Sequence, residues 1–310
     1  MTTALITGAG GHLGRRLVRR LAADGIEVRA LVRSPTGGWP DGVDEIVGDL
    51  AQETRLTRSA AKGVDVVVHL AGASEAAIRR APSAATDESV AAAAAVAASG
   101  APRLIYLSTV HVYGSALAPG ALVSETAVPQ PVSDYAQARR LCEDVMRESG
   151  QPTVILRLTN GLGAPIQRGQ AGWDVVSNEL CRSGVTQGSL VLRSSGTQWR
   201  DFVPLVDVES LLSAMARGEG PDHGLYNVGS GESITVRQLA TEIQDSIERV
   251  VGRRPTLSVP AADTGDTLRS AYRIDVGQLA ALGLFVPTPR PEALDGVVRD
   301  CLSRRPELSD

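Results

Sequence analysis

The sequence predicts an α/β protein in which a doubly wound parallel sheet is followed by a smaller C-terminal lobe. Three observations lead to this prediction. Short β-branched segments alternate with helical patterns through the first half, residues 64–70 are nearly all apolar, and a glycine-rich turn follows the first strand-like segment. A continuous apolar run is typical of a strand that is covered on both faces. Strand–helix alternation with right-handed crossovers then gives a parallel sheet between two helical layers.

The expected strands of this sheet are short β-branched runs bounded by turn residues. They cover residues 4–7, 27–32, 43–47, 64–70, 103–108 and 153–158. The first helix is expected over 13–24, because apolar residues recur there at positions 13, 17, 18 and 21 and Gly25 follows. Further helices are expected over 87–99, which is almost pure alanine, and over 135–148.

After Asn160 the pattern loosens, with frequent glycine and proline up to residue 200. Strand character returns over 200–208, and helices are expected over 236–250 and near 291–302. We therefore expect a dinucleotide-binding domain over 1–160, with part of 201–230 returning to it, and a mainly substrate-binding lobe over 161–310. The length of 310 residues agrees with this division, since single cores stop growing at about 250–300 residues.

Charge and composition exclude several classes of protein. The 31 basic and 35 acidic residues give a net charge of −4 without a basic block, so no nucleic-acid partner is expected. Cys142, Cys181 and Cys301 are far apart and form no metal-binding or disulfide pattern. No apolar run is long enough to span a membrane, and residues 1–6 do not resemble a signal peptide. The expectation is a cytoplasmic protein with no membrane partner and no bound metal.

The glycine-rich turn at 7–14 predicts a Rossmann-type dinucleotide site. Gly8, Gly11 and Gly14 stand at three-residue spacing between the first strand and the first helix. They allow a tight turn, a close approach of the backbone to a pyrophosphate, and close packing of helix on strand. The helix start at His12 and Leu13 then offers backbone N–H groups and a positive dipole end to the anion.

The residue after the second strand bears on which dinucleotide is bound. An NAD site usually carries Asp or Glu here for the adenosine ribose hydroxyls. This sequence has Val32 followed by Arg33, and a guanidinium matches a phosphate bidentately. NADP is therefore favoured over NAD, which remains the alternative.

The ends of the third and fourth strands are expected to complete the cofactor site. Asp49 could accept the adenine amino group, whereas His69 is expected to be a packed residue. The remaining expected contacts come from Leu50, Leu70, Ala71 and Gly72.

Seven motifs in order carry a resemblance to a known family. They are residues 7–14, 69–72, 107–114, 135–139, 156–160, 198–202 and 226–229. Together they resemble the extended short-chain dehydrogenase/reductases, a family of nucleotide-sugar epimerases, dehydratases and ketoreductases. The resemblance covers nearly the whole chain.

The resemblance implies a catalytic group of three residues. Thr109 matches the hydroxyl residue that orients the substrate oxygen, and Tyr135 matches the tyrosine that donates or accepts the proton. Such a phenol stabilises the charge that develops on a carbonyl oxygen during hydride transfer. The family has lysine four residues later, whereas this sequence has Arg139, in a chain whose only lysine is Lys62. Either Arg139 keeps the role of the lysine, or the proton relay is weakened.

The resemblance also implies substrate contacts. Arg200 matches the arginine that binds the nucleotide diphosphate, Asn160 contacts the same region, and Arg269 offers a second phosphate contact. Thr109 and His111 are also expected to contact the substrate, and His111 could act as an acid or base or pack at the end of the strand. Family dehydratases carry Asp-Glu after the catalytic threonine, but here those positions are Val110 and His111, so dehydration is disfavoured.

The function expected from this resemblance is an NADPH-dependent ketoreductase acting on a nucleotide-linked keto-sugar. A 4-keto-6-deoxyhexose in natural-product biosynthesis, such as that of an antibiotic, is one such substrate. Three alternatives stay open: a nucleotide-sugar 4-epimerase with tightly bound NAD, a ketoreductase of a non-sugar ketone, and a non-catalytic NADP-binding protein. A homodimer through the helices at 87–99 and 135–148 is also implied.

Overall fold

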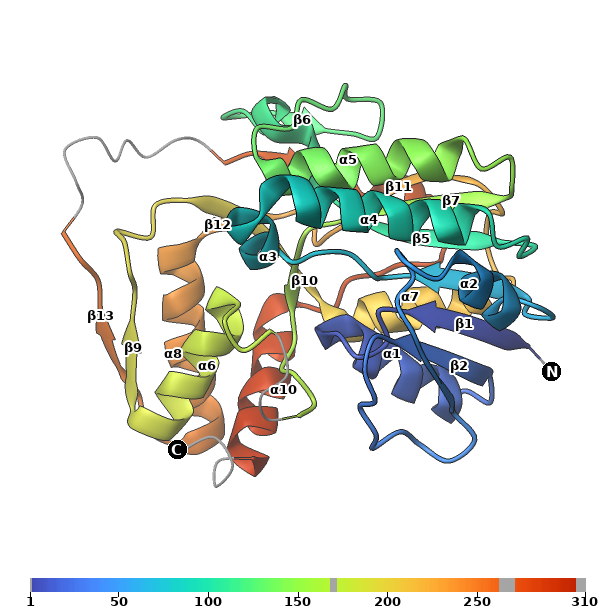
Figure 1. Ribbon diagram of the computed structural model, residues 1–310. Coiled ribbons are helices and arrows are strands. Elements are labelled where there is room, and N and C mark those ends of the chain that lie inside the picture. Colours follow the sequence, from blue (N-terminus) through green and yellow to red (C-terminus); the bar gives the residue numbers. More distant parts are fainter. Residues whose placement is uncertain (1, 168–171, 262–270, 305–310) are drawn as a thin grey trace.

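A seven-stranded parallel sheet is the centre of the molecule, with helices on both faces and a helical lobe beyond the carboxyl ends of its strands (Figure 1). The computed structural model describes residues 2–167, 172–261 and 271–304. The strand order is β11-β7-β5-β4-β1-β2-β3, which is the doubly wound arrangement that the alternating pattern predicts. The strands are β1 (Thr3–Thr7), β2 (Glu27–Val32), β3 (Asp44–Val47), β4 (Val66–His69), β5 (Leu104–Thr109), β7 (Thr153–Leu158) and β11 (Gly224–Val228).

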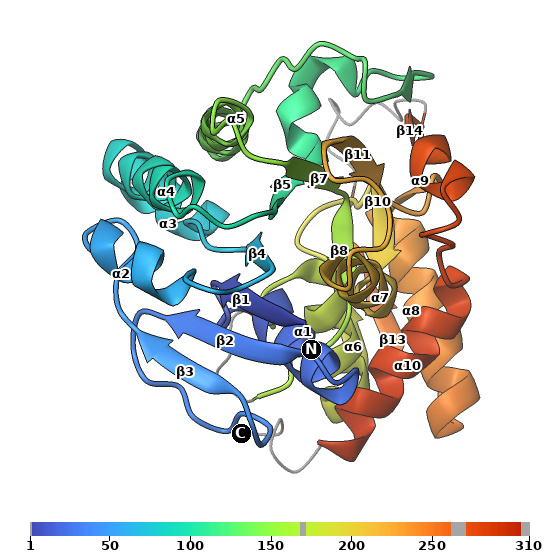
Figure 2. The same cartoon turned by 90° about the vertical axis from the view of Figure 1, so that its right-hand side faces the viewer.

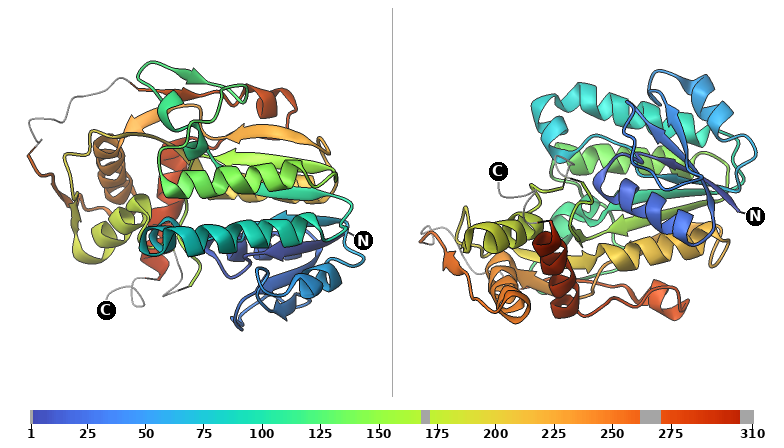
Figure 3. Two further views of the ribbon diagram at one scale, coloured as in Figure 1. Left: turned by 45° about the horizontal axis from the view of Figure 1, so that its top comes forward. Right: turned by 90° about the horizontal axis from the view of Figure 1, so that it is seen from below.

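Two helical layers cover this sheet (Figure 2). On one face lie α1 (His12–Ala23) and α7 (Leu205–Ala216), which pack against each other. The other face carries α2 (Thr54–Ala60), α4 (Pro82–Ala97) and α5 (Asp134–Arg147). The short α3 (Glu75–Arg80) directly precedes α4 and packs against its first turns. Figure 3 shows α4 and α5 lying side by side along the sheet. Because both faces are covered, the central strands are apolar on both sides, and each layer has its own aliphatic core.

The C-terminal lobe is built from three packed helices around a core of its own. These are α6 (Val176–Gln187), α8 (Val236–Val251) and α10 (Arg290–Ser303). A small sheet connects the lobe to the large sheet and consists of β8 (Asn160–Leu162), β10 (Trp199–Pro204) and β12 (Ser233–Thr235). Two further pairs of short strands are β9 (Ser189–Val191) with β13 (Thr256–Ser258), and β6 (Leu122–Val123) with β14 (Arg273–Ile274). The 3₁₀ segment η1 (Val110–Ala116) follows β5, and α9 (Gly277–Ala281) lies near β11.

The expected strand over 200–208 is wrong in its second half. Strand β10 ends at Pro204, and α7 begins at Leu205. The physical reason is a helical repeat: the side chains of Leu205, Val208, Leu211 and Leu212 are all buried on one face of α7. The apolar residues of 200–208 thus belong to two elements with different periods.

The chain returns to the large sheet late in its sequence. Strand β11 pairs in parallel with β7, with Gly224 opposite Val154 and Val228 opposite Leu158. The division into a domain over 1–160 and a lobe over 161–310 stays a prediction. Within the described ranges, no helix is both long and apolar enough to cross a membrane.

Candidate active site

The glycine turn connects the end of β1 to the start of α1 and lies against the end of β4. Gly8 has a φ of +68°, and a Cβ atom there would lie 2.7 Å from the backbone nitrogen of Ala71. A Cβ atom on Gly14 would overlap the carbonyl oxygen of Gly8. Both positions therefore require glycine, and the turn forms the close-fitting backbone cradle that a dinucleotide pyrophosphate needs.

Helix α1 presents an open N-terminus to this cradle. Its N-cap is Gly11, which has no side chain to cap the helix, and its first turn contains no acidic residue. The backbone amides of His12 and Leu13 thus lie at the positive end of the helix dipole. The ring of His12 is turned away, with Nε2 2.8 Å from the carbonyl oxygen of Gly163. Burial lowers the pKa of His12 to about 4, so its ring is neutral at pH 7 and only its backbone amide faces the anion site.

Arg33 lies directly after β2, on the side of the cradle where an adenosine ribose would bind. Its side chain is exposed, and within the described part of the chain no carboxylate pairs with it. The loop that begins at Arg33 borders the cradle, because a Cβ atom on Gly10 would lie 3.2 Å from Cγ2 of Thr36. Arg33 is thus a free cation beside the cradle.

The other predicted cofactor residues line the carboxyl ends of β3 and β4. Asp49 is half-buried, and its Oδ1 accepts a hydrogen bond of 2.9 Å from the backbone of Ala51, which leaves one oxygen free. Leu50 is buried in the core beneath α2 and α4. Leu70 packs on the core beneath α1, and the amide of Ala71 lies 3.4 Å from Oγ1 of Thr7. These residues therefore shape the edge of the sheet, and Asp49 alone among them offers a free side-chain acceptor.

Helix α5 carries Tyr135 and Arg139 on one face, one turn apart. Ser133 caps the helix by accepting a hydrogen bond of 3.2 Å from the amide of Ala136. The Cζ atom of Arg139 lies 5.2 Å from the centre of the Tyr135 ring, and Nη2 lies 3.4 Å from the carbonyl oxygen of Ala73. Burial opposes the charged form, but the neighbouring tyrosine hydroxyls hold the pKa of Arg139 above its ordinary value. Arg139 is thus a fixed positive charge beside the Tyr135 phenol.

Thr109 and His111 stand where β5 ends and η1 begins. Oγ1 of Thr109 accepts a hydrogen bond of 3.2 Å from the amide of His111, and the side chain of Val110 between them is buried. His111 is half-buried, and burial together with the nearby Arg200 lowers its pKa, against the opposing effect of Glu75. The structure therefore brings His111 and Arg200 together, although they are almost 90 residues apart in the sequence.

Arg200 and Asn160 sit on the small sheet that joins the lobe to the large sheet. Arg200 donates a hydrogen bond of 2.8 Å to the carbonyl oxygen of Trp199, and in the described ranges it has no carboxylate partner. Asn160 donates from Nδ2 to the carbonyl oxygen of Asp201 at 2.9 Å, so its amide helps to join β8 to β10. The predicted phosphate contact Arg269 lies outside the described residues.

Sequence reasoning missed a buried ion pair that holds α5 in place. Glu143 and Arg157 are buried, and Nη2 of Arg157 lies 2.6 Å from Oε2 of Glu143. Ser108 donates to the same carboxylate at 2.6 Å. Two features of the sequence could have indicated it: Arg157 is a charged residue inside the otherwise apolar strand 153–158, and Glu143 lies two helical turns after Tyr135.

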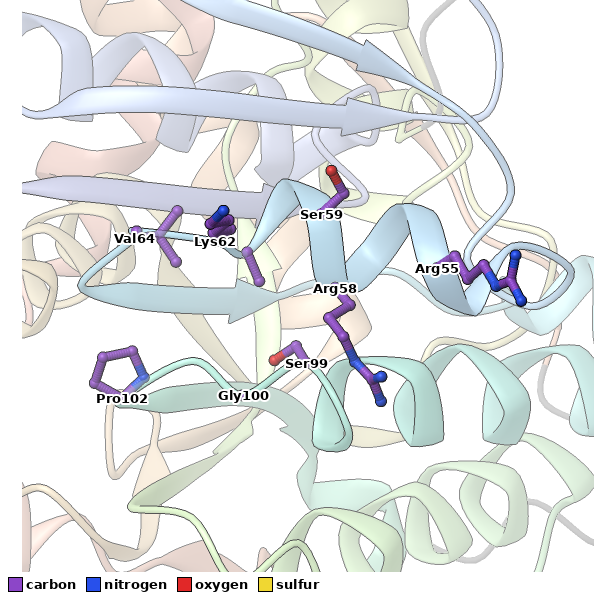
Figure 4. A pocket seen from close by; sticks show the side chains of 10 residues that line it. Arg55, Arg58, Ser59, Lys62, Val64, Ser99, Gly100 and Pro102 are labelled. Atoms are coloured by element: carbon purple, nitrogen blue, oxygen red, sulfur yellow. The ribbon is translucent and has the colours of Figure 1, made fainter.

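A separate pocket lies at the amino ends of β4 and β5, on the other side of the sheet from the carboxyl ends that carry the predicted site. It is bordered by α2 and by the segments that precede β4 and β5, and its lining includes Arg55, Arg58, Lys62, Ser99 and Pro102 (Figure 4). None of the predicted site residues lines it. Among the described residues, no group of three or more acidic, histidine or cysteine side chains could hold a metal ion.

Fold and site together define an NAD(P)-dependent enzyme of the short-chain dehydrogenase/reductase type, with a glycine-rich turn after β1 and the helix α5 that carries Tyr135 and Arg139. Comparison with known sequences gives the same answer, since the profile of the NAD dependent epimerase/dehydratase family matches residues 4–229. The chain belongs to this family.

Several known proteins are similar to the chain. The dTDP-6-deoxy-L-talose 4-dehydrogenase (NAD(P)(+)) of Kitasatospora kifunensis is 33% identical over 249 residues, which cover 76% of each chain. The ceramide reductase of Caulobacter vibrioides is 36% identical over 156 residues, covering 49% of this chain and 44% of the reductase. Among solved structures, MoeE5 in complex with UDP-glucose and NAD has a TM-score of 0.76 and 26% identity, and the match covers 98% of this chain and 99% of MoeE5.

Proposed function

We propose that the protein is an NADPH-dependent ketoreductase of a nucleotide-linked keto-sugar, with a 4-keto-6-deoxyhexose as the preferred sugar class. The bound dinucleotide would supply the hydride that goes to the carbonyl carbon. Tyr135 would donate its phenolic proton to the carbonyl oxygen, Thr109 would hold that oxygen, and Arg139 would stabilise the phenolate left behind. The products are the secondary alcohol and the oxidised dinucleotide.

The segment that follows β5 carries this proposal. Thr109, the last residue of β5, supplies a hydroxyl. The next two positions, at which family dehydratases have an acid and a base, hold Val110, which is buried, and His111, which is half-buried. Neither residue is a carboxylate, and burial together with Arg200 lowers the pKa of His111, which disfavours its acid form. Hydride and proton transfer to a ketone needs neither an acid nor a base at these two positions.

The preference for NADP rests on Arg33. A free guanidinium beside the cradle suits the 2′-phosphate of NADP, and no acidic side chain stands at this position to bind the ribose hydroxyls of NAD. The fit of the dinucleotide itself is supported by the glycine positions where a Cβ atom would collide with backbone.

The substrate class rests on Arg200 and on the similar proteins. Arg200 donates to the backbone of Trp199 but has no carboxylate partner in the described ranges, so its guanidinium can bind a diphosphate beside His111. The relative with 33% identity is named as a dehydrogenase of a dTDP-deoxysugar at carbon 4, which is the reverse of the proposed reduction. The partial similarity to a ceramide reductase keeps a non-sugar ketone as the second candidate.

We also propose a homodimer that uses the outer face of α4 and α5. These two helices pack side by side, and α4 is built largely of alanine, which allows another helix to approach closely. Leu141 on α5 is 48% exposed, an apolar side chain on the same face.

The proposed reaction is tested by mixing the purified protein with NADPH and a dTDP-4-keto-6-deoxyhexose. We expect one mole of NADPH to be oxidised for each mole of sugar alcohol formed. A sugar epimer formed without net NADPH consumption, by a protein that purifies with bound NAD, would instead identify a 4-epimerase.

A further inference from the structure

The guanidinium of Arg139 lies against Gly72, just after the end of β4. Gly72 follows β4 with a φ of +150°, and a Cβ atom on it would lie 2.6 Å from Nη1 of Arg139. The planar group thus lies flat on the backbone of Gly72 and reaches the carbonyl oxygen of Ala73 at 3.4 Å. A guanidinium carries five N–H donors, so this bond leaves Arg139 with donors to spare.

A buried hydroxyl without a partner lies next to this guanidinium. Tyr106 on β5 is fully buried, and its Oη forms no hydrogen bond within the described residues. Its ring packs in the same core as Cys142, which lies one turn after Arg139 on α5. Burial raises the pKa of the Tyr106 hydroxyl, the nearby charge of Arg139 lowers it, and the Cys142 thiol raises it further.

The orientation of the Tyr106 ring is fixed from the other side. It stacks on the ring of His69, with centroids 5.5 Å apart and planes 28° from parallel. His69 in turn has Nδ1 2.7 Å from Oγ1 of Thr7, at the start of the glycine turn. A column of packed polar side chains therefore runs from the cofactor cradle through β4 and β5 to α5.

The buried hydroxyl of Tyr106 needs a polar partner to offset the cost of its burial. Phenylalanine would fill the same space, and a buried hydroxyl without a partner costs about 1–3 kcal/mol. The group within reach that has donors to spare is the guanidinium of Arg139. We propose that Tyr106 is a positioning residue that accepts a hydrogen bond from Arg139 and so fixes the charge beside Tyr135, with Gly72 leaving room for the larger group. The proposal rests on the proposed ketoreductase function, since it assigns Arg139 the role of the family's lysine.

A double-mutant cycle tests this role. The four proteins are the wild type, Tyr106→Phe, Arg139→Lys and the double variant, each assayed for kcat, for KM of the keto-sugar and for NADPH affinity by fluorescence titration. We expect Tyr106→Phe to lower kcat about tenfold in the arginine background, with KM changed less than twofold. In the lysine background the same change should lower kcat less than twofold, because a lysine needs no partner at 106. NADPH affinity should follow the same pattern, with about threefold weaker binding in the arginine background alone.

Equal losses in the two backgrounds, or no loss in either, would overturn the proposal, since a purely packing role does not depend on residue 139. Tyr226→Phe is the matched control, because Tyr226 lies on β11, an edge strand two positions from β5 in the same sheet. It should leave kcat and NADPH affinity unchanged, and the unfolding temperatures of all variants show whether they are folded. If the wild type reduced no keto-sugar, the proposed function would fail, while the cycle in NADPH affinity would still decide the role of Tyr106.

Discussion

Arg33 is the residue on which the choice of cofactor depends. It is exposed, follows β2 directly and has no ion-pair partner in the described part of the chain. We predict that Arg33→Ala weakens NADPH binding by about tenfold or more and NADH binding by less than twofold, because only NADPH carries the phosphate that the guanidinium would bind. Fluorescence titration with both dinucleotides measures this. An equal loss for the two would remove the argument for NADP.

His69 makes the stability of the protein depend on pH. Burial lowers its pKa to about 3, whereas an unfolded histidine has a pKa of about 6.5. Between these values the unfolded chain binds a proton that the folded protein does not take up, so the free energy of unfolding falls as the pH is lowered. Between pH 7 and pH 5 this effect amounts to at most about 2 kcal/mol.

The variant His69→Asn should therefore lose less stability on acidification than the wild type does. Urea unfolding at pH 7 and pH 5 measures the difference, and the wild type should lose up to about 2 kcal/mol more than the variant. His12, whose pKa is lowered to about 4, contributes to both proteins alike. The same loss in both proteins would show that His69 does not titrate as described.

At the scale of elements, the position of α5 depends on the buried pair of Glu143 and Arg157. The pair joins the tyrosine helix to β7, and the Cζ atom of Arg157 also lies 4.6 Å from the centre of the Tyr113 ring. Removing one partner of such a pair leaves a buried charge and typically costs about 3–5 kcal/mol, whereas replacing both with apolar residues costs far less.

We predict that Arg157→Met lowers the free energy of unfolding by about 3–5 kcal/mol, and that Glu143→Leu combined with Arg157→Met restores a large part of this loss. Denaturant unfolding of the single and double variants measures it, with Arg193→Met as the control because the side chain of Arg193 is 84% exposed in its pair with Glu179. A double variant less stable than the Arg157 variant would contradict this account of α5.

The elements could be predicted from the sequence wherever the hydrophobic residues of a segment followed a single repeat, that of a strand or that of a helix. The strands over 27–32 and 153–158 and the helix over 236–250 lie within one residue of the predicted bounds. The prediction over 200–208 failed because a strand and a helix meet at Pro204 without a polar break between them. Helix α4 begins at Pro82, five residues before the predicted start, because proline suits the first turn of a helix.

Site residues could be predicted where a motif linked them to chemistry, and not where they meet only in space. The glycines of the turn and the Tyr135–Arg139 spacing are local in the sequence, so they were found. The contacts of His111 with Arg200, and of Tyr106 with His69 and Arg139, join residues on different elements. Such contacts depend on which strands and helices are neighbours in the fold, and local patterns in the sequence do not determine this.

At the scale of the whole molecule, the outer face of α4 and α5 carries the proposed dimer. We predict that the protein elutes as a dimer in size-exclusion chromatography with light scattering, and that Leu141→Glu converts it to a monomer by placing a charge at the helix contact. Leu282→Glu is the control, since Leu282 is similarly exposed, at 47%, but lies next to α9. A monomeric wild type, or a Leu141 variant that stays dimeric, would place any subunit contact elsewhere.

The sheet, its two helical layers and the lobe together bring the cradle, the tyrosine helix and Arg200 to the carboxyl ends of the sheet strands. The central claim is that the Tyr135 phenol, beside the Arg139 charge, delivers the proton during reduction of a carbonyl group. The most direct test compares the wild type with Tyr135→Phe, in turnover of a dTDP-4-keto-6-deoxyhexose and in NADPH affinity. We expect the variant to lose turnover by at least about 100-fold while it binds NADPH within about twofold of the wild type. A variant that retains turnover would contradict it.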